Sequence, residues 1–366
     1  MTPEELPEPQ RRALAAGLPY RAHVIVTHTC NLACQHCYQA EHRSDDLSLE
    51  ELTRVFHEMA GLGTLFLTLG GGEPLARRDF WEVLAAARKE RFAVDLFTNG
   101  TLVDGEAARR LKQLGVVRVA VSLHGGHAQT HDAFVQRPGT FDRIQRAIDH
   151  LTAAGLATEV KTNVTTTNHR ELPDIEARLG GRPLVQLKHA FHLHAKDDGD
   201  AAPTRLRVDE GQERAATRDE LAGWTAERIG KTFEQAARAQ ARSSEELAPC
   251  QAARTAFALM PNGDVTPCTV TGGLVMGNVR QRPLAEIWGK SAMGRRFRAI
   301  SHGSFEGERD ECASCDFRKV CGRCPALASE ASGSLTGYSA QVCQSTKVRW
   351  TELRRRALEL GLSCPV

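Results

Sequence analysis

Short apolar runs alternate with amphipathic stretches through the first half of the chain. The runs end at polar residues or glycines, as buried strands do, and the stretches between them repeat apolar positions at helical spacing. The predicted strands cover residues 21–26, 64–69, 93–98, 117–123, 158–164 and 184–189. The predicted helices cover 49–62, a stretch from residue 79, 104–114, 141–154 and 171–179. This alternation predicts a parallel sheet with right-handed crossovers.

The strands and helices make six βα units, fewer than the eight of a closed TIM barrel. After residue 189 the pattern changes to a polar stretch, 196–203, and a charged helical stretch, 219–241. A third region of short strands and turns follows, with a hairpin turn predicted at Pro261-Asn-Gly-Asp264. We therefore expect a lead-in at 1–19, a barrel at 20–240 and a second domain at 241–366.

The chain ends in a helical stretch, 344–360, that carries Arg354, Arg355 and Arg356. These arginines are more often a solvated helix face than a nucleic-acid surface. The net charge of +2 over 366 residues gives no broad electrostatic case for nucleic acid either. No apolar run approaches the ~18 residues of a membrane span. The first eight residues, MTPEELPE, are acidic and unlike a signal peptide, so we expect a cytoplasmic protein.

Eleven cysteines in such a protein favour metal binding over disulfides. Cys30, Cys34 and Cys37 are spaced so that, if their loop coils like a helix, the three thiols share one face. They could be three buried cysteines, or a zinc site completed by His28 or His36. They could also hold a 4Fe–4S cluster in which one iron stays open to another ligand.

The spacing C-x3-C-x2-C, followed by the aromatic Tyr38, resembles the cluster loop of the radical SAM enzymes. In that family the open iron binds the amino and carboxylate groups of S-adenosylmethionine (SAM). Six βα units is also the number in the family's partial barrel. The resemblance thus implies an α/β fold, a partial (β/α)6 TIM-like barrel, with SAM and a 4Fe–4S cluster as cofactors.

The loop after the second strand carries the next motif. Gly71-Gly-Glu-Pro74 matches the family's GGEP motif, which lies at the SAM amino group. Glycines such as Gly71 and Gly72 let backbone approach a ligand closely, and Glu73 offers a carboxylate to an ammonium group. Without the resemblance, a glycine triplet of this kind is equally well an ordinary turn.

Other polar residues follow the strand ends, where ligands of parallel α/β sheets gather. In the resemblance Asn99 and Ser122 fall at ribose-contacting positions, and Tyr38 lies against adenine. Arg137 resembles the arginine that pairs with the SAM carboxylate in related enzymes, although a surface salt bridge would look the same. Asn163, late in the fifth strand, is a further candidate.

Three histidines follow the sixth strand: His189, His192 and His194. Their spacing could make a metal site or supply a proton donor above the strand. Unconnected histidines at a strand end are the more common outcome.

A second set of cysteines follows a gap of more than two hundred residues. It contains seven cysteines, from Cys250 to Cys343. A zinc ribbon needs only four ligands, so it would leave three of these cysteines unexplained. The pattern resembles the SPASM domain, which carries auxiliary iron–sulfur clusters. By that resemblance one 4Fe–4S cluster is held by Cys312, Cys315, Cys321 and Cys343. The second auxiliary cluster is held by Cys250, Cys268 and Cys324.

Two departures from the SPASM pattern matter. The family often has three residues between the positions of Cys321 and Cys324, and this chain has two. The second cluster also has only three evident ligands. Its fourth iron could be open, could take Cys364, or could take a ligand that is not cysteine.

The resemblance implies that SAM is cleaved to methionine and a 5′-deoxyadenosyl radical, which abstracts hydrogen from a substrate. In the SPASM group the commonest substrate is a ribosomal peptide with a leader, and crosslinking is the commonest outcome. No peptide-recognition domain precedes the barrel, so we expect a separate leader-binding protein, and flavodoxin or ferredoxin as electron donor. Alternatives are a sulfatase-maturing enzyme, a haem-pathway or small-molecule enzyme, or a non-catalytic iron–sulfur carrier. A carrier would need no SAM pocket, so the GGEP motif, Ser122 and Arg137 argue against it.

Overall fold

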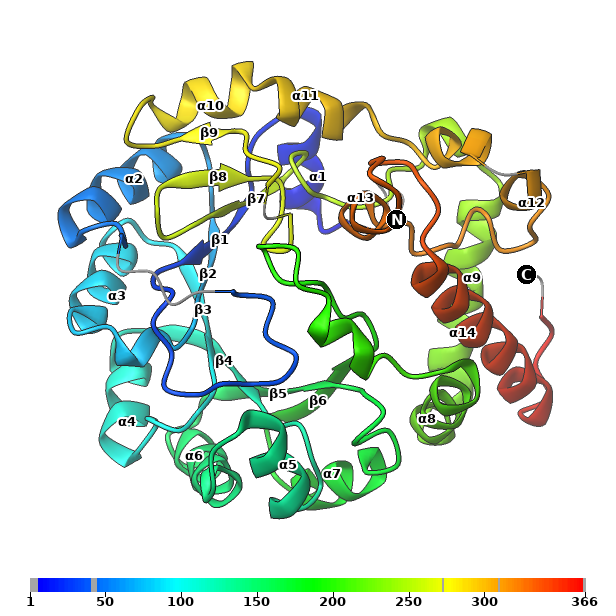
Figure 1. Cartoon of the computed structure of the whole chain (residues 1–366), viewed down its shortest axis with the longest axis horizontal. Coiled ribbons are helices and arrows are strands. Elements are labelled where there is room, and N and C mark those ends of the chain that lie inside the picture. Colours follow the sequence, from blue (N-terminus) through cyan, green and yellow to red (C-terminus); the bar gives the residue numbers. More distant parts are fainter. Residues whose placement is uncertain (1–5, 41–44, 272, 309, 365–366) are drawn as a thin grey trace.

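Six parallel strands form the body of the fold. The computed structural model of the protein describes residues 6–40, 45–271, 273–308 and 310–364. The strands lie in sequence order across the sheet, which confirms the predicted partial barrel (Figure 1). Their bounds are β1 Arg21–Ile25, β2 Phe66–Gly70, β3 Ala93–Thr98, β4 Val116–Ser122, β5 Ala157–Asn163 and β6 Val185–Ala190.

Helices cover the outer face of this sheet, and their apolar sides pack on the strands in the main core. They are α2 Leu49–Gly61, α3 Phe80–Lys89, α4 Gly105–Gln113, α6 Thr140–Ala153 and α7 Leu172–Leu179. A capping box starts α2, since Ser48 accepts from the Glu51 N–H and Glu51 accepts from the Ser48 N–H. Helix α5, Ala128–Val135, was not predicted, because its few buried residues include a histidine, His131, and give little periodicity.

The sheet continues beyond β1, which the sequence did not predict. Strand β7, Ala256–Leu259, pairs parallel to β1, and β8 Asp264–Thr266 and β9 Gly277–Asn278 extend the sheet antiparallel. The turn between β7 and β8 is the predicted hairpin, and Gly263 adopts φ of 90° in it. The second cysteine region is therefore joined to the barrel by backbone hydrogen bonds beside the strand that delivers the first cysteine loop.

A separate small core lies away from the barrel, where α8 and α9 pack against α14, Ala340–Glu359 (Figure 1). The charged stretch predicted as one helix is two, α8 Glu210–Ala222 and α9 Ala226–Gln240, broken at Gly223 and recapped by Thr225. The remaining helices are α1 Glu8–Ala15, α10 Leu284–Lys290, α11 Ala292–Ala299, α12 Asp310–Ala313 and α13 Pro325–Ser332. In the part of the chain that the structure describes, every helix is too short or too polar to traverse a bilayer.

A buried carboxylate joins α14 to α8. Glu352 is 1% exposed and accepts from Arg214, Arg218 and Arg355 at 2.9, 2.8 and 2.7 Å. Burial by itself raises the pKa of Glu352, but the hydrogen bonds of these arginines outweigh it and lower the pKa to about 2. The side chain of Arg356 pairs with Glu359, so the arginine run serves the fold.

We predict that Glu352→Gln lowers the free energy of unfolding by ~2 kcal/mol, because three arginines lose their shared anion. Urea unfolding followed by tryptophan fluorescence measures this, since Trp224 and Trp350 lie in the same small core. Glu359→Gln is the matched control and should cost less than about 0.5 kcal/mol, because Glu359 is largely exposed.

The pH dependence follows from the depressed pKa. The wild-type contribution of Glu352 is complete above the unfolded pKa of about 4.3 and is lost as the pH falls toward 2. The Gln variant should lack this part of the acid sensitivity. Equal acid profiles for the two proteins would contradict the ion-pair account.

Candidate functional site

The loop that follows β1 lies across the carboxyl ends of the strands (Figure 1). Its cysteines, Cys30, Cys34 and Cys37, line a cavity of about 520 Å³, within the ~300–1,000 Å³ range of small-molecule sites. Burial raises the pKa of all three thiols, that of Cys34 to about 12. Thiolates in this setting need a cationic partner such as iron, and a set of three soft sulfur donors suits an iron–sulfur cluster.

The alternative zinc ligands take other partners. His36 is buried, and its ring stacks on Phe134 with the ring centroids 4.9 Å apart. Over the residues that the structure describes, no group of three His, Cys, Asp or Glu side chains is arranged so that it could hold a single metal ion.

A polar network fixes the start of the cysteine loop. Asn99 donates to the Asn31 side chain at 2.7 Å, and Asn31 donates to Thr101 at 2.8 Å. The Asn99 amide also lies 3.9 Å from the Cys30 sulfur. Asn99 was predicted to contact ribose; it lines the cavity but also holds the loop. Asn31 and Thr101 were missed, because a lone asparagine and threonine give no signal in one sequence.

The glycines after β2 are required by the protein's own backbone. A Cβ on Gly71 would lie 2.4 Å from the Thr27 carbonyl oxygen, and one on Gly72 would lie 2.3 Å from that of Thr29. Both glycines line the cavity. They therefore allow the β2 loop to pack directly against the cysteine loop.

Glu73 lies behind these glycines rather than among the residues that line the cavity. Its carboxylate is completely buried and accepts from Thr98 Oγ1 at 2.8 Å, Asn99 N–H at 2.7 Å and Leu75 N–H at 3.0 Å. Burial raises the pKa of Glu73 to about 7. The sequence predicts this carboxylate at the SAM amino group, and that role stays a prediction; in the structure the carboxylate also braces the ends of β2 and β3.

The other predicted SAM contacts divide into two groups. Tyr38, Ser122 and Asn163 line the cavity with the cysteines. Arg137 does not; its guanidinium donates at 2.7 Å to the backbone carbonyl of Asn31, outside the lining residues. Arg137 thus contacts the start of the cysteine loop, and its predicted pairing with the SAM carboxylate stays a prediction.

The three histidines at the end of β6 and just after it do not meet at one site. His189 lies 3.3 Å from Glu220, and His194 lies 3.1 Å from Glu330. His192 lies between them in the sequence, and burial lowers its pKa to about 4. A different histidine group, His124 with His131 and His36, packs at the cavity wall and was not predicted.

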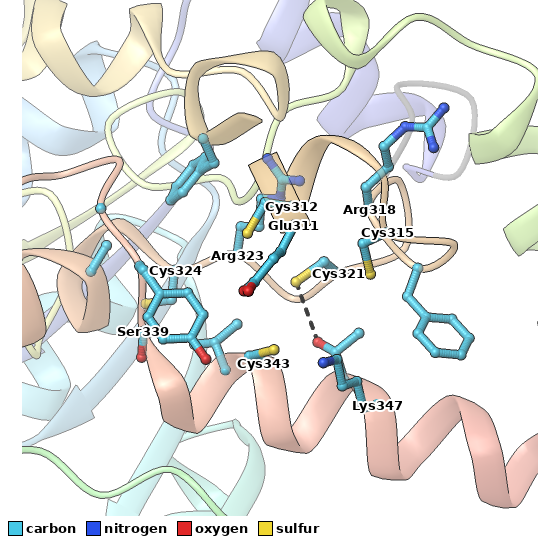
Figure 2. A pocket seen from close by; sticks show the side chains of 17 residues that line it. Glu311, Cys312, Cys315, Arg318, Cys321, Arg323, Cys324, Ser339, Cys343 and Lys347 are labelled. Atoms are coloured by element: carbon cyan, nitrogen blue, oxygen red, sulfur yellow. Dashed lines mark hydrogen bonds between the residues drawn. The ribbon is translucent and has the colours of Figure 1, made fainter. Parts of the chain in front are cut away.

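The second set of cysteines surrounds a smaller cavity of about 120 Å³ (Figure 2). The Thr346 hydroxyl on α14 lies 3.4 Å from the Cys321 sulfur. Positive charge around the cavity comes from Arg318, Arg323 and Lys347. The cysteines that line this cavity are Cys312, Cys315, Cys321, Cys324 and Cys343.

Cys250 belongs to a neighbouring group. Burial raises the pKa of its thiol to about 11, with smaller contributions from the nearby thiols of Cys324 and Cys268. The Tyr38 phenol lies near thiols of both groups: burial raises its pKa most, and the thiols of Cys37 and Cys268 raise it further. Thr269, next to Cys268, lines the barrel cavity. The Cys250 group is therefore adjacent to the site under the first cysteine loop.

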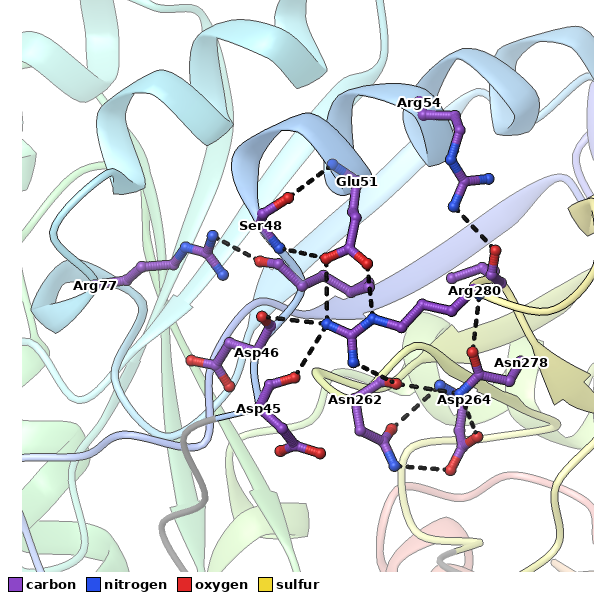
Figure 3. Close-up of polar contacts among 12 residues, drawn as sticks. Asp45, Asp46, Ser48, Glu51, Arg54, Arg77, Asn262, Asp264, Asn278 and Arg280 are labelled. Atoms are coloured by element: carbon purple, nitrogen blue, oxygen red, sulfur yellow. Dashed lines mark hydrogen bonds and ion pairs between the residues drawn. The ribbon is translucent and has the colours of Figure 1, made fainter.

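A polar clamp holds the β8–β9 region against the segment that follows the cysteine loop (Figure 3). Arg280 donates to the Glu51 carboxylate at 2.7 Å and to the backbone carbonyls of Asp45 and Asp46. Asp46 in turn accepts from Thr27 Oγ1 at 2.5 Å, at the start of the cysteine loop. The clamp ties the position of that loop to the second cysteine region.

Comparison with known proteins decides the family. The family model of the radical SAM superfamily matches residues 24–177, and that of the SPASM iron–sulfur cluster-binding domain matches 250–316. The AdoMet-dependent heme synthase of Nitratidesulfovibrio vulgaris is 31% identical over 330 residues, which cover 84% of this chain and 88% of that protein. The chain belongs to the radical SAM enzymes with a SPASM domain. Its cofactors are therefore SAM, a 4Fe–4S cluster and auxiliary iron–sulfur clusters.

Other similar proteins include a mycofactocin maturase and a protein solved with a precursor peptide. The mycofactocin maturase MftC of Mycobacterium tuberculosis is 29% identical over 314 residues, which cover 81% of this chain and 75% of that protein. The fold matches Streptococcus suis SuiB bound to precursor peptide SuiA, with a TM-score of 0.69 and 15% identity over 92% of this chain and 79% of that one. At that identity the likeness to SuiB concerns the fold alone.

Cys364 lies apart from both cavities. It packs against the small core of α8, α9 and α14, and its sulfur lies 3.7 Å from the Arg354 carbonyl oxygen. We predict that anaerobically reconstituted wild-type protein and the Cys364→Ser variant both carry about 12 irons per chain, three 4Fe–4S clusters. Iron and zinc analysis, with electron paramagnetic resonance of the reduced clusters, measures this.

Cys324→Ser is the positive control for that count and should lose about four irons. Loss of one cluster's signal in Cys364→Ser would instead make Cys364 the missing ligand. About four irons and one zinc in the wild type would contradict the assignment of the auxiliary cysteines.

Proposed function

We propose that this radical SAM enzyme modifies a ribosomally synthesised peptide by hydrogen abstraction, with a crosslink as the product. The observation that carries the proposal is the adjacency of the two sulfur sites. One cavity is lined by the first cysteine loop and by Thr269, next to Cys268. A substrate in that cavity can reach both the SAM site and the Cys250 group, as an oxidative crosslink requires.

The first three cysteines hold the catalytic cluster in this proposal. When bound, the cluster and SAM supply hydrogen abstraction through a 5′-deoxyadenosyl radical. The backbone of Gly71 and Gly72 borders the SAM methionine end, while Asn99, Ser122 and Asn163 offer amide and hydroxyl groups to the ribose. Tyr38 borders the adenine. The apolar lining residues Leu32, Val135 and Ile144 exclude water from the reacting centre.

The auxiliary sites have different roles. Four thiols, those of Cys312, Cys315, Cys321 and Cys343, would close one cluster, which then serves electron transfer. Cys250, Cys268 and Cys324 would leave one iron of the other cluster for a substrate or non-cysteine ligand. A leader-binding protein and a flavodoxin or ferredoxin donor complete the proposed system.

A haem-pathway reaction is the second candidate, because the similarity to the AdoMet-dependent heme synthase extends over 84% of the chain. Both candidates use the same cavity and the same cysteines. They differ in the substrate, which the following experiment varies.

We predict that the reconstituted enzyme, given SAM and dithionite without oxygen, removes hydrogen from a short peptide encoded beside its gene. Mass spectrometry should show a peptide that has lost two hydrogen atoms. One 5′-deoxyadenosine should form for each modified peptide. Fe-coproporphyrin III is the parallel substrate, and reactions without SAM are the control. An unchanged peptide together with a porphyrin that loses carboxyl groups would overturn the peptide assignment and support the haem candidate.

A further inference from the structure

The barrel cavity has an uneven charge. Among the described residues that line it there is no aspartate or glutamate. Two lysines line it, Lys161 and Lys196. Lys196 is paired with Asp200 at 2.7 Å, so its charge is already balanced. Burial lowers the pKa of the lining histidines His23, His124 and His131, which disfavours a positive charge on them. Lys161 is therefore the cation of interest.

Lys161 projects from β5, two residues before the strand ends at Asn163, and its neighbour in register on β4 is Ser122. Its ammonium lies 4.0 Å from the centroid of the Phe97 ring. Two residues of a strand span about 6.6 Å, so Lys161 lies deeper in the barrel than Asn163 at the strand end. The Lys161 side chain is 40% exposed, which leaves it accessible from the cavity.

The carboxylates beneath Lys161 are held mainly by another cation. Arg118 donates to Glu159 at 2.9 Å and also binds Asp95. The ammonium of Lys161 approaches Glu159 only to 3.4 Å, longer than the about 2.7–2.9 Å of a charge-assisted hydrogen bond. An ammonium has three donors, so Lys161 keeps donors available to a ligand. Burial lowers the pKa of Lys161, and a bound anion would offset that loss of hydration.

We propose that Lys161 binds a carboxylate of the substrate in this cavity. The inference rests on the proposed function, because it assumes that substrate and SAM share the cavity. A single ammonium matches the single charge of a carboxylate, whereas a phosphate dianion would stay half-neutralised. The carboxylate can come from a peptide or from a porphyrin propionate. SAM also has a carboxylate, so the experiment measures the binding of SAM and the binding of a substrate-like carboxylate separately.

The test uses glutarate as the probe and glutaramide as its uncharged match, with reconstituted enzyme saturated with SAM. Binding is measured by saturation-transfer difference NMR on wild type, Lys161→Met and Lys161→Arg. We expect glutarate to bind wild type and Lys161→Arg, and to bind Lys161→Met about tenfold more weakly, or about 1.4 kcal/mol. Glutaramide should not bind. Lys188→Met, the register neighbour on β6 that does not line the cavity, is the matched control and should behave as wild type.

The second measurement is the dissociation constant of SAM in each variant, by anaerobic calorimetry. We expect less than about a twofold change in Lys161→Met. Weaker SAM binding there, by about tenfold, would assign Lys161 to the SAM carboxylate and overturn the proposal. Equal glutarate binding in wild type and Lys161→Met, or none in wild type, would also overturn it. An enzyme that still modifies its peptide in those cases leaves the proposed function intact.

Discussion

The buried carboxylate of Glu73 is the contact on which the site depends. It joins the ends of β2 and β3 through Thr98 and Asn99, and the Glu73 N–H donates to the Thr29 carbonyl oxygen in the cysteine loop. These hydrogen bonds compensate for the cost of burying the carboxylate. Because the glycines before it leave no room for a side chain, the β2 loop and the cysteine loop fit as one unit.

The second constraint is the position of β1. This strand lies between β2 and β7, so it belongs both to the barrel and to the sheet extension that carries the auxiliary cysteines. Arg280 adds a side-chain connection, through the Glu51 carboxylate and the backbone carbonyl of Asp46. The cysteine loop leaves β1 between these two attachments. The distance between the cysteine loop and the Cys250 group is therefore set by backbone pairing. A fixed distance suits electron transfer between two centres.

The six barrel strands were predictable because each is a short apolar run between helical stretches, and only their ends shift by a residue or two. The pairing of β7 with β1 was not, since it joins segments more than two hundred residues apart and leaves no periodic signal. The cysteines were found from spacing alone. The partners of Glu73 and Arg137 within the protein were not predictable, because such contacts depend on packing and leave no motif. Glu73 accepts from Thr98 and Asn99. Arg137 donates to the Asn31 carbonyl oxygen. Lys161 was missed because a lysine in a strand resembles any solvated residue.

The central claim is that only the first three cysteines hold the cluster that cleaves SAM. The direct measurement is 5′-deoxyadenosine formation under reducing, anaerobic conditions by Cys34→Ala and Cys315→Ala, each checked for folding by circular dichroism. The account predicts that Cys34→Ala forms none, because Cys34 lines the barrel cavity, whereas Cys315→Ala still cleaves SAM, because Cys315 lines only the second cavity. Undiminished formation by a folded Cys34→Ala protein would contradict the account.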